Sequence, residues 1–353
     1  CGVDPKAACT VFFGGSEGFC NIVEGCWFEF SSDSEITENT IGIMISEGDY
    51  GEGLANRNHV FRKNVFKNYA YGILIGSHDD TVGEYGHIVE YNVVDTCSID
   101  GIMVKCGDTQ IRGNRITNCK RNSISVIAGK GSVVVDNRVE DSSTGITVKG
   151  IGHTVQNNCI IHCPQQAIEL PGTLPDDKVQ SENIFIEQNT CIDCGSETNT
   201  EAIAGVHIRR DSSCIVRRNL FHGKGKPYVI DWEHDEQERP TQKRNYFIDD
   251  NLLSGECESL EGTEVSTIEF ASVADKNYHN SSGYGARGWV LDRKTYDPDE
   301  EEAQDTSHTI PPPFTETQIG TDDSPADDVI DELNEKELYK RSLLFNKKKR
   351  KER

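Results

Sequence analysis

The chain has 353 residues, and its 59 aspartates and glutamates outnumber its 36 lysines and arginines, which gives a formal net charge of -23. This balance argues against a nucleic-acid-binding protein, because the phosphate backbone requires a basic surface. No apolar run approaches the ~18 residues that a transmembrane helix requires, so we expect no membrane span. An acidic polymer remains a possible ligand, since a local basic stripe can lie on an acidic body.

The first 40 residues are rich in glycine and cysteine, and we expect irregular structure there with one or two early coils of the repeat that follows. The whole chain has 13 cysteines. Those in this irregular part are the candidates for disulfide bonds, namely Cys1, Cys9, Cys20 and Cys26. Four later cysteines share one position of the repeat and are expected to be buried free thiols, namely Cys97, Cys119, Cys163 and Cys194.

A repeat with an asparagine period runs through residues 41–295. Asn92, Asn114, Asn137 and Asn158 follow one another at intervals of 22, 23 and 21 residues, and a fixed period of this length indicates stacked structural units. Asparagine tolerates the left-handed turn conformation and can hydrogen-bond to neighbouring coils, which predicts a structural ladder. The coils centre on Asn64, Asn92, Asn114, Asn137, Asn158, Asn189 and Asn219.

Each repeat contains two short segments with strand character. The first segments include GILIG (72–76), GIMVK (101–105), SISVI (123–127) and GITVK (145–149), and the second include HIVEYN, TQIRGN and VVVDN. Their β-branched residues and their Gly, Asn or Asp ends are typical of strands. Strands this short, recurring without crossover helices, predict an all-β fold, a right-handed parallel β-helix.

Strand alternation assigns the two faces of the first segment. Its β-branched residues point inward, beginning with Ile73 and Ile75, and the remaining residues form two outward columns. One column is Leu74, Met103, Ser125, Thr147, Glu169 and His207, and the other is Gly76, Lys105, Ile127, Lys149, Pro171 and Arg209. Such a sheet suits an extended acidic sugar, and an ordinary solvated face is the alternative. The expected substrate-binding residues are Met103, Thr147, Glu169 and Arg210.

The composition changes beyond the repeat. Residues 296–335 are dominated by Asp, Glu, Thr and Pro, which predicts a disordered acidic linker. Residues 336–353 combine a short helical pattern with the closing KKKRKER. This basic tail is either a localisation or polyanion-binding segment or simply a solvated end.

A face of this kind could cleave a uronic-acid polymer by β-elimination. The reaction needs a metal or cations to neutralise the carboxylate, a base to remove the C5 proton and an acid to protonate the leaving oxygen. A lysine whose pKa is lowered by nearby positive charge can serve as the base. Hydrolysis would instead need two carboxylates about 5–9.5 Å apart, and Glu169 is the acidic residue of the outward columns.

Two motifs carry a family resemblance. The motif NYAYGILIG (68–76) and the later stretch VEYNVVDTCSIDGIMVKCGDTQIRGNRI (89–116) resemble polysaccharide lyase family 6, the chondroitinase-B and alginate-lyase group. The resemblance implies a pectin-lyase-like β-helix, calcium (Ca2+) bound by Asn68 and Asp100, and Lys105 as the base. Ser98 stands where the family has its first acid, and Ile127, or Val126, stands where it has an arginine.

Three functions therefore remain open. The first is an extracellular or secreted, monomeric lyase acting on an acidic polysaccharide, with Lys105 as base and Lys149, His207 or Arg209 assisting. The second is a non-catalytic glycan-binding or adhesin-type scaffold. The third is a sugar epimerase or hydrolase on the same fold, because one fold hosts many chemistries.

Overall fold

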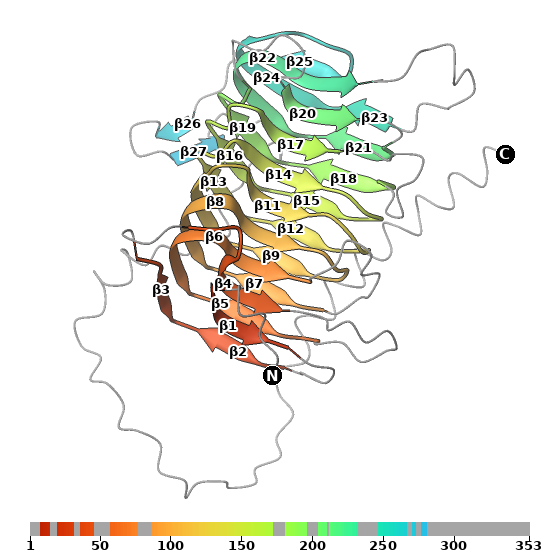
Figure 1. Cartoon of the computed structure of the whole chain (residues 1–353). Coiled ribbons are helices and arrows are strands. Elements are labelled where there is room, and N and C mark those ends of the chain that lie inside the picture. The colour runs from red at the N-terminus through yellow and green to blue at the C-terminus, as the bar shows by residue number, and fades with distance from the viewer. Residues whose placement is uncertain are drawn as a thin grey trace, which may run out of the picture. The chain divides into compact units, whose positions relative to one another are not determined.

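The structure is a computed structural model that describes residues 8–14, 20–31, 36–45, 57–76, 86–171, 181–195, 204–209, 212–231, 246–266, 270–272 and 277–280. All regular structure in these residues is β-strand, so none of them forms a helix that could cross a membrane. The predicted acidic linker, the predicted basic tail and Arg210 lie outside these ranges. The chain folds into stacked coils (Figure 1) whose strands pair in parallel from one coil to the next.

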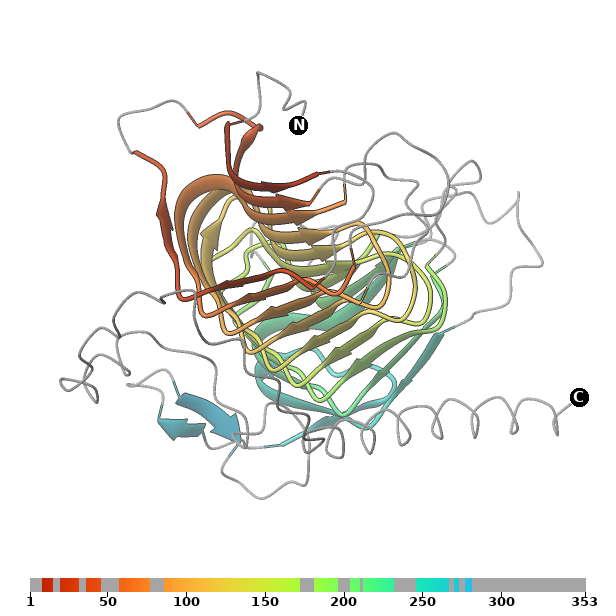
Figure 2. The same cartoon turned by 90° about the horizontal axis from the view of Figure 1, so that it is seen from below.

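One face of the stack is a nine-stranded parallel sheet built from the second predicted segment of each repeat. Figure 2 views the stack from below, where successive coils lie over one another. The strands of this sheet are β2 (Ile22–Glu24), β5 (Val60–Arg62), β7 (Ile88–Glu90), β9 (Gln110–Arg112), β12 (Val133–Val135), β15 (Thr154–Gln156), β18 (Ile184–Glu187), β21 (Cys214–Arg217) and β23 (Tyr246–Asp249).

The other two faces belong to one 16-stranded sheet, because long strands such as β6 and β8 continue around a corner of the coil. The first predicted segments form one face. A third strand, which follows each repeat asparagine and which the sequence did not predict, forms the other. The strands are β1 (Ala8–Phe13), β3 (Trp27–Glu29), β4 (Thr40–Ile45), β6 (Val65–Ile75), β8 (Val93–Val104), β10 (Arg115–Cys119), β11 (Asn122–Val126), β13 (Arg138–Glu140), β14 (Thr144–Val148), β16 (Cys159–Ile161), β17 (Gln166–Leu170), β19 (Thr190–Ile192), β20 (Ala204–Arg209), β22 (Leu220–Asp231), β24 (Asn251–Cys257) and β25 (Thr263–Val265). An antiparallel pair, β26 (Phe270–Ser272) and β27 (Asn277–Asn280), follows.

The core consists of inward residues that stack like on like. Ile102, Ile124 and Ile146 are in register on β8, β11 and β14, and each is fully buried. The same column continues through Ile168 on β17 and Val206 on β20. The predicted inward face is thus confirmed. It fixes which residues of the same strands must point outward, because side chains alternate along a strand.

The repeat asparagines form a buried ladder that extends to Asn251, and all of them are fully buried. Asn137 is typical: its Nδ2 donates to the carbonyl of Ile111 and to Oδ1 of Asn158, at 2.9 and 3.0 Å. Its own Oδ1 accepts from the backbone N–H of Asn114 at 2.9 Å. The ladder therefore satisfies backbone groups at a corner where the regular sheet pairing is interrupted.

The repeat cysteines are buried free thiols, as predicted. Cys97 and Cys119 are in register on neighbouring coils, and Cys163 and Cys194 are also buried. The disulfide prediction is wrong for Cys9, Cys20 and Cys26, which are free. The physical reason is that the neighbouring coil offers no thiol: Cys9 pairs with Ile41, Cys26 N–H donates to Asn64, and Cys20 N–H donates to Arg57. Cys1 lies outside the described residues.

We expect the thiols to differ sharply in reactivity. Burial raises the pKa of Cys159 and of Cys214 to about 12, whereas Cys20 is exposed. Since the thiolate is the nucleophile, iodoacetamide should alkylate Cys20 in the native protein and leave Cys159 and Cys214 unmodified until denaturant is added. Peptide mapping by mass spectrometry measures this. Native-state modification of Cys159 at the rate of Cys20 would contradict the buried assignment.

Candidate functional site

The first predicted outward column exists in the structure. Residues in register from coil to coil place Leu74, Met103 and Ser125 side by side on β6, β8 and β11. The same register continues through Thr147, Glu169 and His207 on β14, β17 and β20. The column therefore crosses one face of the 16-stranded sheet, and its character changes along the stack.

The N-terminal half of this column is apolar. Leu74 and Met103 pack with Ile41, and Tyr71 and Ile127 lie against them. Met103 is almost fully buried in this cluster, so its contacts are with other side chains of the protein. Ile127 takes part in the same packing, which explains structurally why an apolar residue occupies the position where the resembled family has arginine.

The C-terminal half of the column is polar and brings four predicted residues together. Thr147 Oγ1 donates to Glu169 Oε2 at 3.4 Å. Arg209 Nε lies 3.3 Å from Glu169 Oε1 and also 3.3 Å from His207 Nδ1. His207 is buried, whereas the Arg209 side chain is 36% exposed. This cluster can hold a charged group at its exposed edge while Glu169 fixes the guanidinium.

Lys105 and Lys149 follow the ends of β8 and β14, and both are half-buried. The backbone N–H of Lys105 donates to Ile75, and that of Lys149 donates to Val126, which places both in the second outward column. Ile127 stands on the coil between them. Coils are about 4.8 Å apart, so the two lysines are separated by about 10 Å, and Arg209 follows another two coils on.

Asp100 is fully buried and fully engaged by neighbouring donors. Arg121 Nε donates to its Oδ1 and Arg121 Nη2 to its Oδ2, both at 2.8 Å. Asn122 adds its backbone N–H and its Nδ2, both at 3.1 Å from Oδ1. Arg121 was not among the residues predicted from the sequence. The feature that could have pointed to it is its position directly before the strand β11.

Asn68 does not face Asp100. It occupies a turn position with a left-handed φ of 60°, shared on the next two coils by Thr96 and Asn118 at 59°. The residue of β6 in register with Asp100 is Tyr71. Asn68 thus lies at a different point of the coil from Asp100. Both carboxylate oxygens of Asp100 already accept hydrogen bonds from Arg121.

These residues do not fit the calcium site that the resemblance implied. Calcium takes about six to eight oxygen ligands, and the carboxylate expected to supply one of them is held by a guanidinium. Within the described ranges, no group of three or more His, Cys, Asp or Glu side chains could hold a metal ion. We therefore derive no step of any reaction through calcium.

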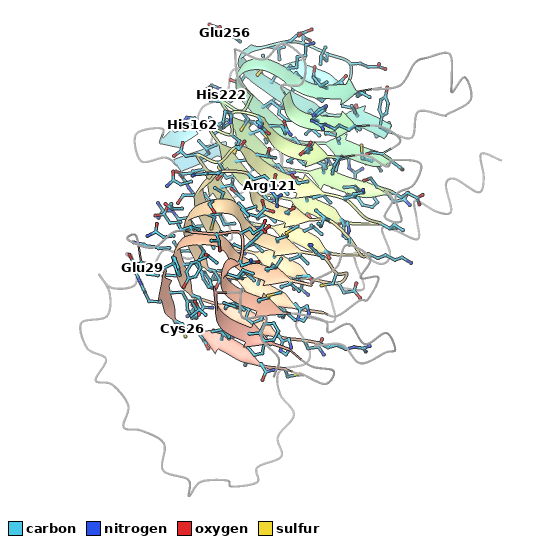
Figure 3. All side chains as sticks on the ribbon, in the orientation of Figure 1. Cys26, Glu29, Arg121, His162, His222 and Glu256 are labelled. Carbon is cyan, nitrogen blue, oxygen red and sulfur yellow. The ribbon has the colours of Figure 1, made fainter. Side chains whose placement is uncertain are left out.

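Arg121 and Tyr71 form the outer part of this network. Burial raises the pKa of Tyr71, and the neighbouring Arg121 acts in the opposite direction. The hydrogen bonds that Arg121 donates to Asp100 raise the pKa of Arg121, which keeps the guanidinium charged. The Arg121 side chain is 52% exposed, and Figure 3 labels it among the central coils.

Stacked parallel coils, an inward isoleucine column and an asparagine ladder together define the class: a right-handed parallel β-helix with a polysaccharide-lyase-like fold. The family profile described as periplasmic copper-binding protein (NosD) matches residues 14–174, which is less than half of the chain. No curated protein matches the chain.

The similar solved structures include two of the polysaccharide lyase family 6 alginate lyase AlyGC. An arginine-to-alanine variant of that enzyme aligns with a TM-score of 0.55 and 16% identity, covering 74% of this chain and 38% of the enzyme. A second AlyGC structure gives 0.51 and 14%, covering 83% of this chain and 54% of the enzyme. The predicted fold is confirmed, and the aligned part spans about half or less of the enzyme.

Proposed function

We propose that this protein binds a uronic-acid polysaccharide along the outward face of β8–β20 and cleaves it by β-elimination, as a monomer in an extracellular or periplasmic compartment. The likeness to alginate lyases supports the fold on which this chemistry is placed. The substrate class is a polymer that contains uronic acids, either at every sugar, as in alginate, or at every second sugar, as in chondroitin sulfate. Which of these polymers is cleaved is decided by the assay below.

One observation carries the proposal: the second outward column has a cation at every second coil. Lys105, Lys149 and Arg209 occupy these positions on a chain whose net charge is -23. Cations about 10 Å apart along a rigid sheet match a linear polyanion that lies parallel to the stack. A solvated surface of this acidic chain would not be expected to place its cations at equal steps in one column.

The chemistry assigns one role to each cation. Lys105 Nζ removes the C5 proton, and the electron pair left on C5 forms the C4–C5 double bond as the C4–O4 bond breaks. Lys149 neutralises the uronate carboxylate, which acidifies the C5 proton. Solvent water supplies the proton that the leaving oxygen accepts, because Arg209 lies two coils beyond Lys149; with Glu169 and His207 holding its guanidinium, Arg209 binds a carboxylate further along the polymer.

Replacing Lys105 by alanine should lower turnover of the cleaved polymer by about 100-fold or more, because a positioned general base contributes at least this factor. The measurement is the ultraviolet absorbance of unsaturated uronate formed from alginate, chondroitin sulfate, dermatan sulfate or pectate. Lys130→Ala is the matched control, since Lys130 is exposed and outside both columns. Activity that survives Lys105→Ala at the level of Lys130→Ala would remove Lys105 from the role of base.

A second function, glycan binding without cleavage, is favoured by one specific observation. The saturated Asp100 and the packed Ile127 occupy two positions where the resembled lyases carry catalytic machinery. Binding of a uronic-acid polymer by wild-type protein that forms no unsaturated product would select this function over the first.

A further inference from the structure

We infer that Arg121, held in place by Asp100, is an anion-binding residue that receives a carboxylate of an acidic polysaccharide on the outward face. The substrate class rests on the proposed function, whereas the site itself rests on the contacts described here. In this assignment a guanidinium recognises the carboxylate, and no metal ion takes part.

Asp100 holds the guanidinium of Arg121 in a fixed orientation. The two 2.8 Å bonds to Asp100 form a bidentate pair that fixes the plane of the guanidinium. Two further donors from Asn122 hold the carboxylate itself. Arg121 is therefore a preorganised group, and binding a ligand does not require its side chain to be ordered first.

Part of the Arg121 guanidinium remains accessible to a ligand. A guanidinium has five N–H groups, of which Asp100 accepts two. The hydroxyl oxygen of Tyr71 accepts a hydrogen bond from the same guanidinium. Because the Arg121 side chain is 52% exposed, a ligand in solvent can reach its outer edge. The planar fork of a guanidinium matches a carboxylate, which selects an acidic sugar over a neutral one.

Hydrogen bonds connect Arg121 to the polar cluster of Thr147, Glu169, His207 and Arg209. Asn122 accepts a hydrogen bond from Thr147 Oγ1 at 2.9 Å, and Thr147 also contacts Glu169. A continuous chain of polar contacts thus leads from Arg121, next to β11, across β14 to β17. Arg121 precedes β11, whereas the cation column follows the ends of these strands, so Arg121 contacts a sugar that extends across the strands to the opposite edge of the sheet.

The test compares two double variants with one single variant. Asp100→Asn removes the buried charge and keeps the guanidinium. Asp100→Asn/Arg121→Gln removes both charges, and Asp100→Asn/Lys120→Gln has the same net charge but changes an exposed neighbour instead. Circular dichroism and thermal unfolding establish that all three fold. Calorimetric titration with polymannuronate and polyguluronate fragments of alginate then measures affinity, with and without EDTA.

We expect Asp100→Asn and Asp100→Asn/Lys120→Gln to bind with the same affinity, and Asp100→Asn/Arg121→Gln to bind about tenfold or more weakly than either. EDTA should change none of these values. Equal affinity of the two double variants would overturn the assignment, as would loss of binding in EDTA or absence of wild-type binding. Binding that depends on Arg121 without any unsaturated product would uphold the site and reject the cleavage reaction.

Discussion

Asn137→Ala should lower the free energy of unfolding by about 3–5 kcal/mol, since each buried polar group left without a partner costs about 1–3 kcal/mol. The Asn137 side chain accepts from both the N–H and the Nδ2 of Asn114, at 2.9 Å each. It also donates to Ile111 and Asn158. Alanine removes all four bonds at a fully buried position.

Denaturant unfolding followed by circular dichroism measures this effect. Gln110→Ala is the control, because Gln110 is an exposed strand residue of a neighbouring coil and surface substitutions usually change stability by less than about 0.5 kcal/mol. If Asn137→Ala and Gln110→Ala shift the unfolding midpoint equally, the asparagine ladder does not stabilise the stack.

Acid should destabilise the protein through histidines that are buried at a second corner of the coil. Burial lowers the pKa of His87 to about 3 and that of His153 to about 4, from an ordinary value of 6.5. Both accept a backbone N–H at Nδ1, from His59 at 3.3 Å and from Ser132 at 3.0 Å. Protonating either ring would remove that acceptor.

The direction of this pH effect depends on which state, folded or unfolded, binds more protons. Below pH 6.5 the unfolded state binds a proton at each histidine that the folded state does not, so stability falls as the pH decreases toward the folded pKa. Each histidine should lower the free energy of unfolding by about 2 kcal/mol between pH 8 and pH 5. The loss is fully reversed above pH 6.5, where the unfolded state is also neutral.

Unfolding free energies measured from pH 5 to pH 8 test this prediction. His87→Asn should flatten the profile, because the amide oxygen can accept the same N–H but does not titrate in this range. His162→Gln is the control, since the His162 side chain is half-exposed beside Asp141 and Asp193. An unchanged pH profile in His87→Asn would show that the buried ring does not cause the acid sensitivity.

Much of the fold could be predicted because the stack imposes one rule on every coil. The period of the asparagines and the alternation of Ile102 and Val104 with Met103 sufficed to identify the coils, the inward face and the outward column. The same type of residue recurs at the same position one coil later, so the repeat can be recognised without knowing the conformation of the turns.

The third strand of each coil was not predicted, for a physical reason. Strands such as β13 and β16 have only three residues and one central inward side chain, Val139 or Ile160. One apolar position gives no alternation to recognise. The inward residues of these strands form a column from coil to coil, so no single segment of the sequence shows a strand pattern.

The site was predicted in part. Thr147, Glu169 and His207 lie in register on successive coils, as the predicted first column requires, whereas Arg209 belongs to the second column and its contacts with Glu169 and His207 were not predicted. The Asp100–Arg121 pair was not foreseen, since Arg121 lies 21 residues further along the chain and just outside the strand pattern. The long side chain of Arg121 reaches back to the preceding coil, and the spacing of residues in the sequence does not predict this contact.

The most direct test of the central claim is the mass of the products formed from an alginate or glycosaminoglycan oligosaccharide. Elimination yields two fragments whose masses sum to that of the substrate, one of them with a C4–C5 double bond. We expect this result for the wild type and its loss in Lys105→Ala. Fragments whose summed mass exceeds the substrate by one water would show hydrolysis, and an intact oligosaccharide would show that this face does not cleave it; either outcome contradicts the proposed reaction.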